Sequence, residues 1–292
     1  MKKSIAFIIN PISGGIPKHR IPQLVAQEID ATRFNTEIFY TESTEHNKHL
    51  AEQCVRNGFD AIVAVGGDGT INNTAKYIAG TNVAFGIVPL GSGNGLARHL
   101  GLSKNPQHAL KTINHFYQTN IDTGTVNNEF FINVAGVGFD AHVTGKFAVA
   151  PRRGFWQYAK ITLAEFAGYK ARQYELIIDG VKSIESAFLI CVANGSQYGN
   201  NAYISPLSIV NDGVFEVTIL RPFKLHQMPQ LGAMIFRKTI HQSAQVKVFS
   251  GKHIIIKRTA NELVNIDGEP VQIEQDLDIK IHAGNLKIIC NE

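Results

Sequence analysis

The stretch AIVAVGGDGTINN, residues Ala61–Asn73, joins an apolar run to a glycine-rich loop and then to a helical pattern. The run Ala61–Val65 is typical of a buried strand, and the apolar residues after Thr70 recur with the spacing of a helix. Strand, glycine loop and helix in this order can hold a phosphate, because the loop and the helix N-terminus direct backbone N–H groups at an anion. Asp68 is unexpected in such a loop, since a carboxylate repels phosphate.

The first third of the chain alternates apolar runs with helical faces, which predicts a mostly parallel, doubly wound α/β domain over residues 1–121. We expect strands at Ser4–Asn10, Thr36–Tyr40, Ala61–Val65 and Val83–Leu90. Helices are expected around Ile21–Ile29, Leu50–Val55, Ile71–Ala79, Leu96–Leu100 and Ala109–Tyr117.

Two more glycine-rich loops follow predicted strands, NPISGG at Asn10–Gly15 and PLGSGNGLAR at Pro89–Arg98. Any one of the three could be only a tight turn. Because the carboxyl ends of parallel strands share one edge of the sheet, three such loops together predict one nucleotide site. The P-loop pattern GxxxxGK[ST] is absent. The candidate nucleotide-binding residues are Asn10, Pro11, Ser13, Gly14, Thr41, Gly66, Gly67, Asp68, Gly69, Thr70, Asn72, Gly91, Ser92 and Asn94.

After Ile121 the strand-like segments follow one another directly, and Asp-Gly pairs fall at 179–180, 212–213 and 267–268. Asp-Gly between apolar segments is a strong hairpin signal, so residues 122–285 are predicted to form an antiparallel β-sandwich. Helical inserts are expected near Phe155–Arg172 and Leu225–Ile240, and a final strand, 286–292, could return to the first domain. The expected strands are Phe130–Val134, Tyr174–Ile178, Ala187–Ala193, Val214–Leu220, Gln245–Phe249, His253–Lys257, Leu263–Ile266, Leu277–Ile281 and Leu286–Ile289.

The composition of the chain limits the kinds of molecule that it is expected to bind. The chain has 292 residues and a formal net charge of +4, which fits a nucleotide or an acidic membrane surface, and no arginine-rich run points to nucleic acid. Three distant cysteines without CxxC spacing predict reduced thiols in a cytoplasmic protein. No apolar stretch is long enough to span a bilayer, so membrane contact is expected to be peripheral, at the inner face.

The motifs NPISGG, VGGDGTINN, PLGSGNGLAR, IDTGTVN, INVAGVGFDAHV and NIDGEP occur here in the order seen in the diacylglycerol kinase catalytic family. This family includes soluble bacterial lipid kinases and sphingosine kinases, and the sequence resembles it over almost its whole length. GGDGT alone is shared with NAD kinases. The resemblance implies an α/β nucleotide domain followed by a β-sandwich domain, with the active site in the cleft between them.

The resemblance also implies an ATP- and Mg²⁺-dependent kinase that phosphorylates a lipid hydroxyl, diacylglycerol- or sphingosine-like. In such an enzyme Asp68 would act through Mg²⁺, directly or through water, although it could also cap the following helix. Asp267 or Glu269, in the matching DGE element, is the candidate general base, and the sequence leaves open which of the two it is.

Further metal-linked residues are implied by the same resemblance. The loop IVNDGVFEV is similar to a structural Mg²⁺ loop, with Asp212 as side-chain ligand and the carbonyls of Ile209 and Val214 completing it; a plain hairpin turn is the alternative. Asp122 matches an acidic position near the metal network. Gly95 stands where many bacterial diacylglycerol kinases have Asp, which leaves the lipid undetermined.

Two other functions remain as alternatives, and one insert allows two interpretations. An NAD kinase-like enzyme and a catalytically silent nucleotide- or lipid-binding regulator are the competing functions. The insert 151–172 combines basic and aromatic residues, which suits a helix lying on a membrane surface, but also an ordinary amphipathic helix packed on the sandwich. The sequence leaves a homodimer open.

Overall fold

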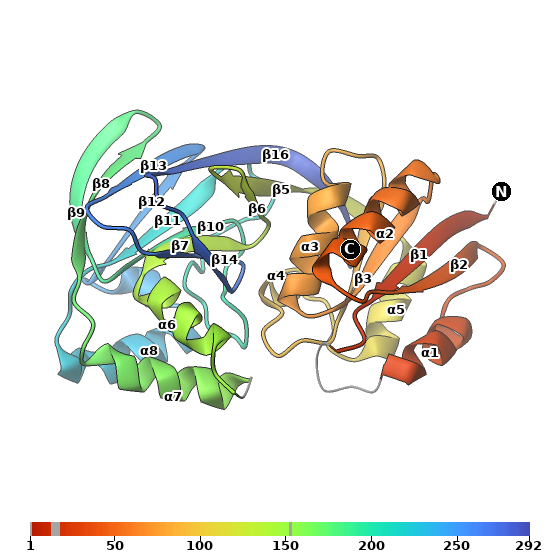
Figure 1. Ribbon diagram of the computed structural model, residues 1–292, viewed down its shortest axis with the longest axis horizontal. Coiled ribbons are helices and arrows are strands. Elements are labelled where there is room, and N and C mark those ends of the chain that lie inside the picture. The colour runs from red at the N-terminus through yellow and green to blue at the C-terminus, as the bar shows by residue number, and fades with distance from the viewer. Residues whose placement is uncertain (1, 13–17, 152–153) are drawn as a thin grey trace. The chain divides into compact units, whose positions relative to one another are not determined.

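The computed structural model describes residues 2–12, 18–151 and 154–292 (Figure 1). The chain forms two compact units. Unit 1 comprises the residues up to Ile121 together with Gly284–Glu292, and unit 2 comprises Asp122–Ala283.

Unit 1 is built on a parallel sheet in the order β2-β1-β3-β4, with the end of β16 beside β4. Strands β1 and β3 are paired so that Ile5 lies opposite Ala61 and Ile9 opposite Val65. Every residue of β3 and β4 is buried, as expected for parallel strands covered on both faces. The predicted α/β architecture is therefore confirmed. The strands are β1 (Lys3–Ile9), β2 (Phe34–Tyr40), β3 (Ala61–Gly66), β4 (Ala84–Pro89) and β16 (Leu277–Ile289).

The helices of unit 1 pack on this sheet through apolar faces. Ile21 and Val25 of α1 and Leu110 and Ile113 of α5 join one core with the sheet, while α2 and α3 contact each other. Ser43 caps α2, because its side chain accepts a hydrogen bond from the backbone N–H of His46. The helices are η1 (Lys18–Arg20), α1 (Ile21–Glu28), α2 (Thr44–Arg56), α3 (Asp68–Ile78), α4 (Gly95–His99) and α5 (Pro106–His115).

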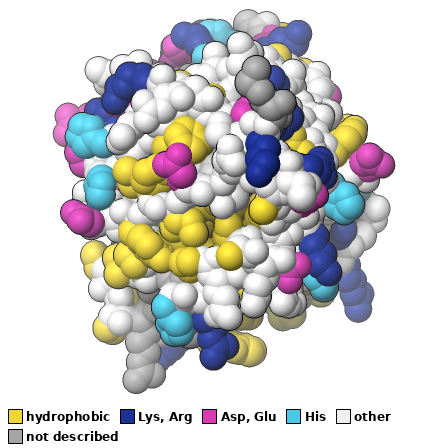
Figure 2. All heavy atoms as spheres, turned by 90° about the vertical axis from the view of Figure 1, so that its right-hand side faces the viewer, with side chains coloured by type: hydrophobic (Ala, Val, Ile, Leu, Met, Phe, Trp, Pro, Cys, Tyr) yellow, Lys and Arg dark blue, Asp and Glu magenta, His cyan; other side chains and the backbone are white. Residues whose placement is uncertain are grey.

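Strand β2 forms an edge of the unit 1 sheet, because it pairs only with β1. Figure 2 looks onto the side of the molecule on which this edge lies, where hydrophobic side chains gather among charged ones. Asn35, Thr36 and Glu37 of β2 are exposed. Polar and charged side chains on an edge strand disfavour pairing with a strand of another molecule.

Unit 2 is a sandwich of two antiparallel layers, as predicted. One layer has the order β12-β11-β10-β7-β14-β15, and β9, β8, β13 and the start of β16 pair in the other, which also receives β5 and β6. Side chains from both layers form one core, which includes Phe131, Val137, Leu176, Ile190 and Ile254. The strands are β5 (Gln118–Val126), β6 (Glu129–Phe131), β7 (Val134–Gly138), β8 (Arg172–Ile178), β9 (Val181–Ala187), β10 (Leu189–Ala193), β11 (Phe215–Leu220), β12 (Val246–Gly251), β13 (His253–Arg258), β14 (Leu263–Ile266) and β15 (Glu269–Gln272).

Helices of unit 2 share a second core with strands β7 and β10. Phe139 and Val143 of α6 and Leu231 of α8 are buried with Leu189, and Phe166 of α7 packs against them. The predicted inserts are thus helical, although shorter than expected, and α6 was not predicted. The helices are α6 (Phe139–Ala148), α7 (Phe155–Phe166), η2 (Leu225–Gln227), α8 (Met228–Phe236) and η3 (Ile240–Gln242).

One predicted strand is wrong in its extent. Phe130–Val134 was expected to be continuous, but β6 ends at Phe131 and β7 begins at Val134. The backbone N–H groups of Ile132, Asn133 and Val134 all bind the carboxylate of Asp267. The chain turns around this buried side chain, and no local pattern in the sequence reports such a distant partner.

Candidate active site

The glycine loops after β1, β3 and β4 are joined to one another at the carboxyl ends of their strands. The side chain of Asn10 donates to Thr70 Oγ1 at 3.1 Å, which links the first loop to the second. Leu90 N donates to Gly66 O at 2.7 Å, and a Cβ added to Gly91 would lie 2.6 Å from the Cα of Gly67. Glycine is required here because the second and third loops approach each other backbone to backbone.

Asp68 connects the second loop to the third. Its Oδ2 accepts from Asn94 N at 2.8 Å and its Oδ1 from Gly95 N at 2.9 Å. Burial raises the pKa of Asp68 above its usual range, against the effect of these backbone N–H groups. The role of the Asp68 carboxylate is therefore not limited to its own helix, α3. It also accepts hydrogen bonds from the backbone at the start of α4.

Asn94 shapes the third loop from within. It is fully buried with a φ of 52°, its Nδ2 donates to Gly91 O at 2.6 Å, and its Oδ1 accepts from Gly91 N at 3.2 Å. Its side chain thus bonds to the loop backbone itself. The sequence pattern predicts Asn94 as a nucleotide-binding residue and gives no sign of this contact within the loop.

The remaining candidate nucleotide residues are distributed along the same edge. Thr41 is buried directly after β2, and its N–H donates to Ile9 O at 2.9 Å. Pro11 and Ser92 are exposed. Ser13 and Gly14 lie outside the described residues. Gly69 and Asn72 are partly buried in the first turns of α3.

The hairpin between β14 and β15 separates the roles of the two candidate bases. Asp267 is buried, and its carboxylate accepts three backbone N–H bonds of 2.8 to 2.9 Å from Ile132, Asn133 and Val134. Both of its oxygens are engaged in holding the chain. Glu269 is the first residue of β15, and its side chain is exposed.

The predicted metal loop lies against Asp122 within unit 2. Asp122 Oδ2 accepts from Gly213 N at 2.8 Å, and Asp122 N donates to Val210 O at 2.6 Å. Asp212 is exposed, and its Oδ1 accepts from Val214 N at 3.2 Å, as in an Asx-turn. Ile209 is exposed beside them. The structure therefore brings the four residues of the predicted metal set into one neighbourhood.

A buried carboxylate that sequence reasoning missed lies behind the β14–β15 hairpin. Asp140, in the first turn of α6, accepts hydrogen bonds from the side chains of Asn265 and Tyr198. Burial raises the pKa of Asp140 to about 7. The available signal was its place in INVAGVGFDAHV, one of the motifs that carried the family resemblance.

Residues 2–12, 18–151 and 154–292 contain no group of three or more His, Cys, Asp or Glu side chains that could hold a metal ion. Within the same ranges no helix has the length and apolar character needed to cross a membrane.

Comparison with known proteins now adds to this geometry. Residues 4–126 match the model of the diacylglycerol kinase catalytic domain, and residues 133–290 match the YegS C-terminal NAD kinase beta sandwich-like domain. The chain belongs to the diacylglycerol kinase catalytic-domain family. The glycine loops and Asp68 lie in the segment that matches the catalytic domain, and the β14–β15 hairpin lies in the segment that matches the second domain.

Individual members of the diacylglycerol kinase family are similar over different lengths. The chain is 33% identical to a Chromohalobacter salexigens protein named "Probable lipid kinase YegS-like", over 62% of this chain and 61% of that protein. It is 29% identical to a Mycobacterium tuberculosis diacylglycerol kinase, over 65% and 64%, and 26% identical to the Bacillus subtilis diacylglycerol kinase, over 91% and 90%. The first two matches thus span less than two thirds of those relatives.

The fold of the diacylglycerol kinase family is found over the whole chain. A crystal structure of a diacylglycerol kinase from Bacillus anthracis (strain Sterne) superposes with a TM-score of 0.77, at 19% identity, covering 99% of this chain and 97% of that one.

Proposed function

We propose that this protein is a lipid kinase that transfers the γ-phosphate of ATP to a lipid hydroxyl, with Glu269 as the general base. The observation that carries the choice of base is the contrast at the β14–β15 hairpin. Asp267 is buried with both oxygens accepting backbone N–H bonds, whereas Glu269 is exposed. An accessible carboxylate can approach a substrate hydroxyl and take its proton in the transition state.

The nucleotide is assigned to the three joined glycine loops of unit 1. Their backbones lie at the carboxyl ends of parallel strands, where ligands of such sheets bind. The N–H groups of Asn94 and Gly95 already bind Asp68, so they hold the loop rather than a phosphate. We infer that other N–H groups of these loops, around Gly67, contact the phosphates.

Mg²⁺ is the metal that the family implies, and the carboxylates of this chain fit it. Burial raises the pKa of Asp68, so a nearby divalent cation would offset the cost of its charge. Kinases hold Mg²⁺ with only one or two carboxylates, since phosphates and water supply the other oxygens. Asp68 is the proposed side-chain ligand beside the glycine loops, and the bound ion would neutralise charge on the transferring phosphate.

The test of the proposed function combines a panel of acceptors with one substitution. Labelled ATP is offered with diacylglycerol, sphingosine, ceramide, phosphatidylglycerol or NAD, and the products are separated by chromatography. On the best lipid, Glu269→Gln should lower kcat by about a hundredfold or more, because a general base contributes that much. Glu274→Gln, at another exposed glutamate of unit 2, is the matched control and should keep full activity.

Other outcomes of this test select another function. Label on NAD alone would identify the NAD kinase-like alternative. ATP binding without transfer to any acceptor would favour the silent regulator. Full activity of Glu269→Gln would rule out Glu269 as the base.

We also propose that α7 and α8 bring the enzyme to its lipid at an anionic membrane surface. Trp156 and Leu163 of α7 are 83% and 65% exposed, and Phe236 of α8 is 50% exposed. The two helices are neighbours, since the rings of Phe155 and Phe236 lie 6.4 Å apart between centroids. Exposed aromatic and aliphatic side chains of this kind suit insertion at the boundary between lipid headgroups and acyl chains.

The charge of the same region supports an anionic partner. Lys160, Lys224 and Arg237 are exposed on or beside these helices, and the chain carries no acidic residue between Glu216 and Glu262. Glu165, the acidic residue of α7, is paired with His142 at 2.7 Å. Basic side chains near a membrane surface are attracted by anionic lipids.

The single tryptophan of the chain makes this contact measurable. Trp156 fluorescence should shift to the blue with phosphatidylglycerol vesicles and not with phosphatidylcholine vesicles. Leu163→Glu should abolish the shift, whereas Ile184→Glu, at an exposed apolar residue of β9, should not. An unchanged spectrum with both vesicles would favour helices that merely pack on the sandwich.

A further inference from the structure

The turn that carries Glu269 is closed from inside by Asn265. This residue lies on β14, is 2% exposed, and its Oδ1 accepts from Gly268 N at 2.9 Å. Gly268 directly precedes Glu269. The orientation of the Asn265 amide therefore controls where the chain enters β15.

Asp140 determines that orientation. Its Oδ2 accepts from Asn265 Nδ2 at 3.2 Å and from the Tyr198 hydroxyl at 3.1 Å. Because Asp140 Oδ2 and Gly268 N lie on opposite sides of the amide as acceptor and donor, the nitrogen of Asn265 faces Asp140 and its oxygen faces Gly268. Asp140 thus links α6, the segment around Tyr198, and the β14–β15 hairpin.

The Asp140 carboxylate is tightly packed by its neighbours. Gly136 of β7 pairs with Asn265, and a Cβ at residue 136 would lie 2.6 Å from Asp140 Oδ2. Asp140 is only 4% exposed, so its charge is removed from water at considerable cost. Among the described residues, five ionisable side chains interact with its charge: Tyr158, Tyr169, Cys191, Tyr198 and Glu262.

We propose that Asp140 is a positioning residue for phosphate transfer, which acts through Asn265 and the β14–β15 turn on the side chain of Glu269. The inference rests on the proposed function, because it takes Glu269 as the general base. Asp140 itself is buried behind the hairpin and does not contact the substrate in this arrangement. Its effect should therefore appear in the catalytic step, with ATP binding at the glycine loops left intact.

The experiment removes the acceptor and then restores it. Asp140→Leu has a similar shape but no acceptor for Asn265 Nδ2, which allows the Asn265 amide to turn away from Gly268. We expect kcat to fall by about tenfold to a hundredfold, with KM for ATP changed less than about threefold. Asp140→Asn should keep most of kcat, because its amide oxygen can still accept from both Asn265 Nδ2 and the Tyr198 hydroxyl.

Control variants separate positioning from stability. Tyr198→Phe removes the other hydrogen bond to the same oxygen but leaves the bond to Asn265, so kcat should stay within about threefold of wild type. Thermal unfolding is followed for each variant, and kcat is compared well below the lowest Tm. If Asp140→Leu does not fold, Asn265→Ala removes the same link and should show the same loss of kcat at constant KM.

Two results would overturn the inference. Wild-type kcat in the folded Asp140→Leu or Asn265→Ala protein would show that the link is not needed for catalysis. A loss of kcat in Asp140→Asn as large as that in Asp140→Leu, at wild-type Tm, would show that Asp140 acts by another route. Full activity of Glu269→Gln would instead reject the proposed base, so the two failures are distinguishable.

Discussion

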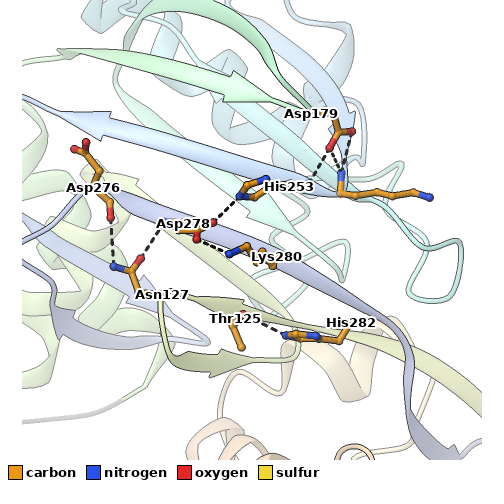
Figure 3. A network of polar contacts seen from close by, with 9 residues as sticks. Thr125, Asn127, Asp179, His253, Asp276, Asp278, Lys280 and His282 are labelled. Carbon is orange, nitrogen blue, oxygen red and sulfur yellow. Dashed lines mark hydrogen bonds and ion pairs between the residues drawn. The ribbon is translucent and has the colours of Figure 1, made fainter.

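Two hairpins in unit 2 are built from the same Asp-Gly turn. Asp179 and Asp267 have φ of 48° and 49°, and the glycines that follow have φ of 85° and 89°. Each aspartate also accepts backbone N–H bonds from a neighbouring segment. Asp179 accepts from Lys252 N and His253 N at 2.9 to 3.1 Å. Asp267 accepts from Ile132, Asn133 and Val134. Figure 3 shows Asp179 beside His253.

The difference between the hairpins lies in their surroundings. Asp179 is exposed, and the residue after its glycine is the apolar Val181. Asp267 is buried, and the residue after its glycine is Glu269. Asn265 and Asp140 support the second turn from behind through two successive hydrogen bonds. The dipeptide specifies the turn, and the distant residues packed around it determine whether the turn can hold a reactive side chain.

The largest expected difference between the two hairpins is in stability. Asp267→Asn must leave at least one of three buried N–H groups facing an amide nitrogen, and we expect a loss of about 3 kcal/mol in the free energy of unfolding. Asp179→Asn should cost about 1 kcal/mol or less, because water can satisfy the exposed N–H groups. Urea unfolding of both variants measures this. Equal losses would mean that burial does not separate the two turns.

A smaller difference should appear in the pH dependence of stability. The pKa of Asp140 is about 7 in the folded protein, raised by burial from an ordinary value of 3.8. Between these values the folded state keeps a proton that the unfolded state releases, so the wild type loses stability as pH rises. The Asp140→Asn variant has no titrating group at this position, so it does not lose this stability as pH rises.

The variant should therefore gain about 2 kcal/mol relative to wild type between pH 5.5 and 7.5. Chemical unfolding at both pH values measures the difference, in which groups common to both proteins cancel. Burial raises the pKa values of Tyr158, Cys191 and Tyr198, so these neighbours stay neutral in this range. A constant difference across the range would show that Asp140 does not titrate there.

The smallest effect is expected beside the Asp179 hairpin, at Asp278. Its side chain is 44% exposed and contacts Lys280 and His253 at 2.6 Å each, as seen in Figure 3. The hydrogen bond from Lys280 lowers the pKa of Asp278, so its contribution is present above the unfolded-state pKa and is lost as pH falls through the folded-state pKa. Asp278→Asn should cost less than about 1 kcal/mol at low salt and less still at high salt. A larger loss of unfolding free energy that does not depend on salt would contradict the interpretation that Asp278 forms exposed ion pairs screened by salt.

The sequence predicted the elements whose signals are local. Ala61–Val65 and the glycine loop after it were recognised from an apolar run that ends in Gly66-Gly67, and the structure has β3 at Ala61–Gly66. Leu277–Ile281 and Leu286–Ile289 were expected as two strands. The structure continues one strand, β16, through them.

The site was harder to predict where its contacts are distant in sequence. The role of Asp68 as a link to Asn94 and Gly95 spans 26 and 27 residues, and the bond from Asn265 to Asp140 spans 125. Helix α6 was missed because its buried residues include Asp140 and Thr144 beside apolar ones, so no simple apolar stripe marks it. Only folding brings these partners together, within the α/β unit for Asp68 and within the sandwich for Asp140.

Strand β16 has a consequence for the order in which the protein is made. Its first residues pair with β13 in unit 2, and Ile288 pairs with Phe85 in unit 1. Every residue of unit 2 has left the ribosome's catalytic centre once Ala283 is added, while the sheet of unit 1 still lacks a strand at that moment. During translation unit 1 therefore stays incomplete after unit 2 has been added, and the growing chain must carry an open sheet edge at β4 until residues 284–289 follow.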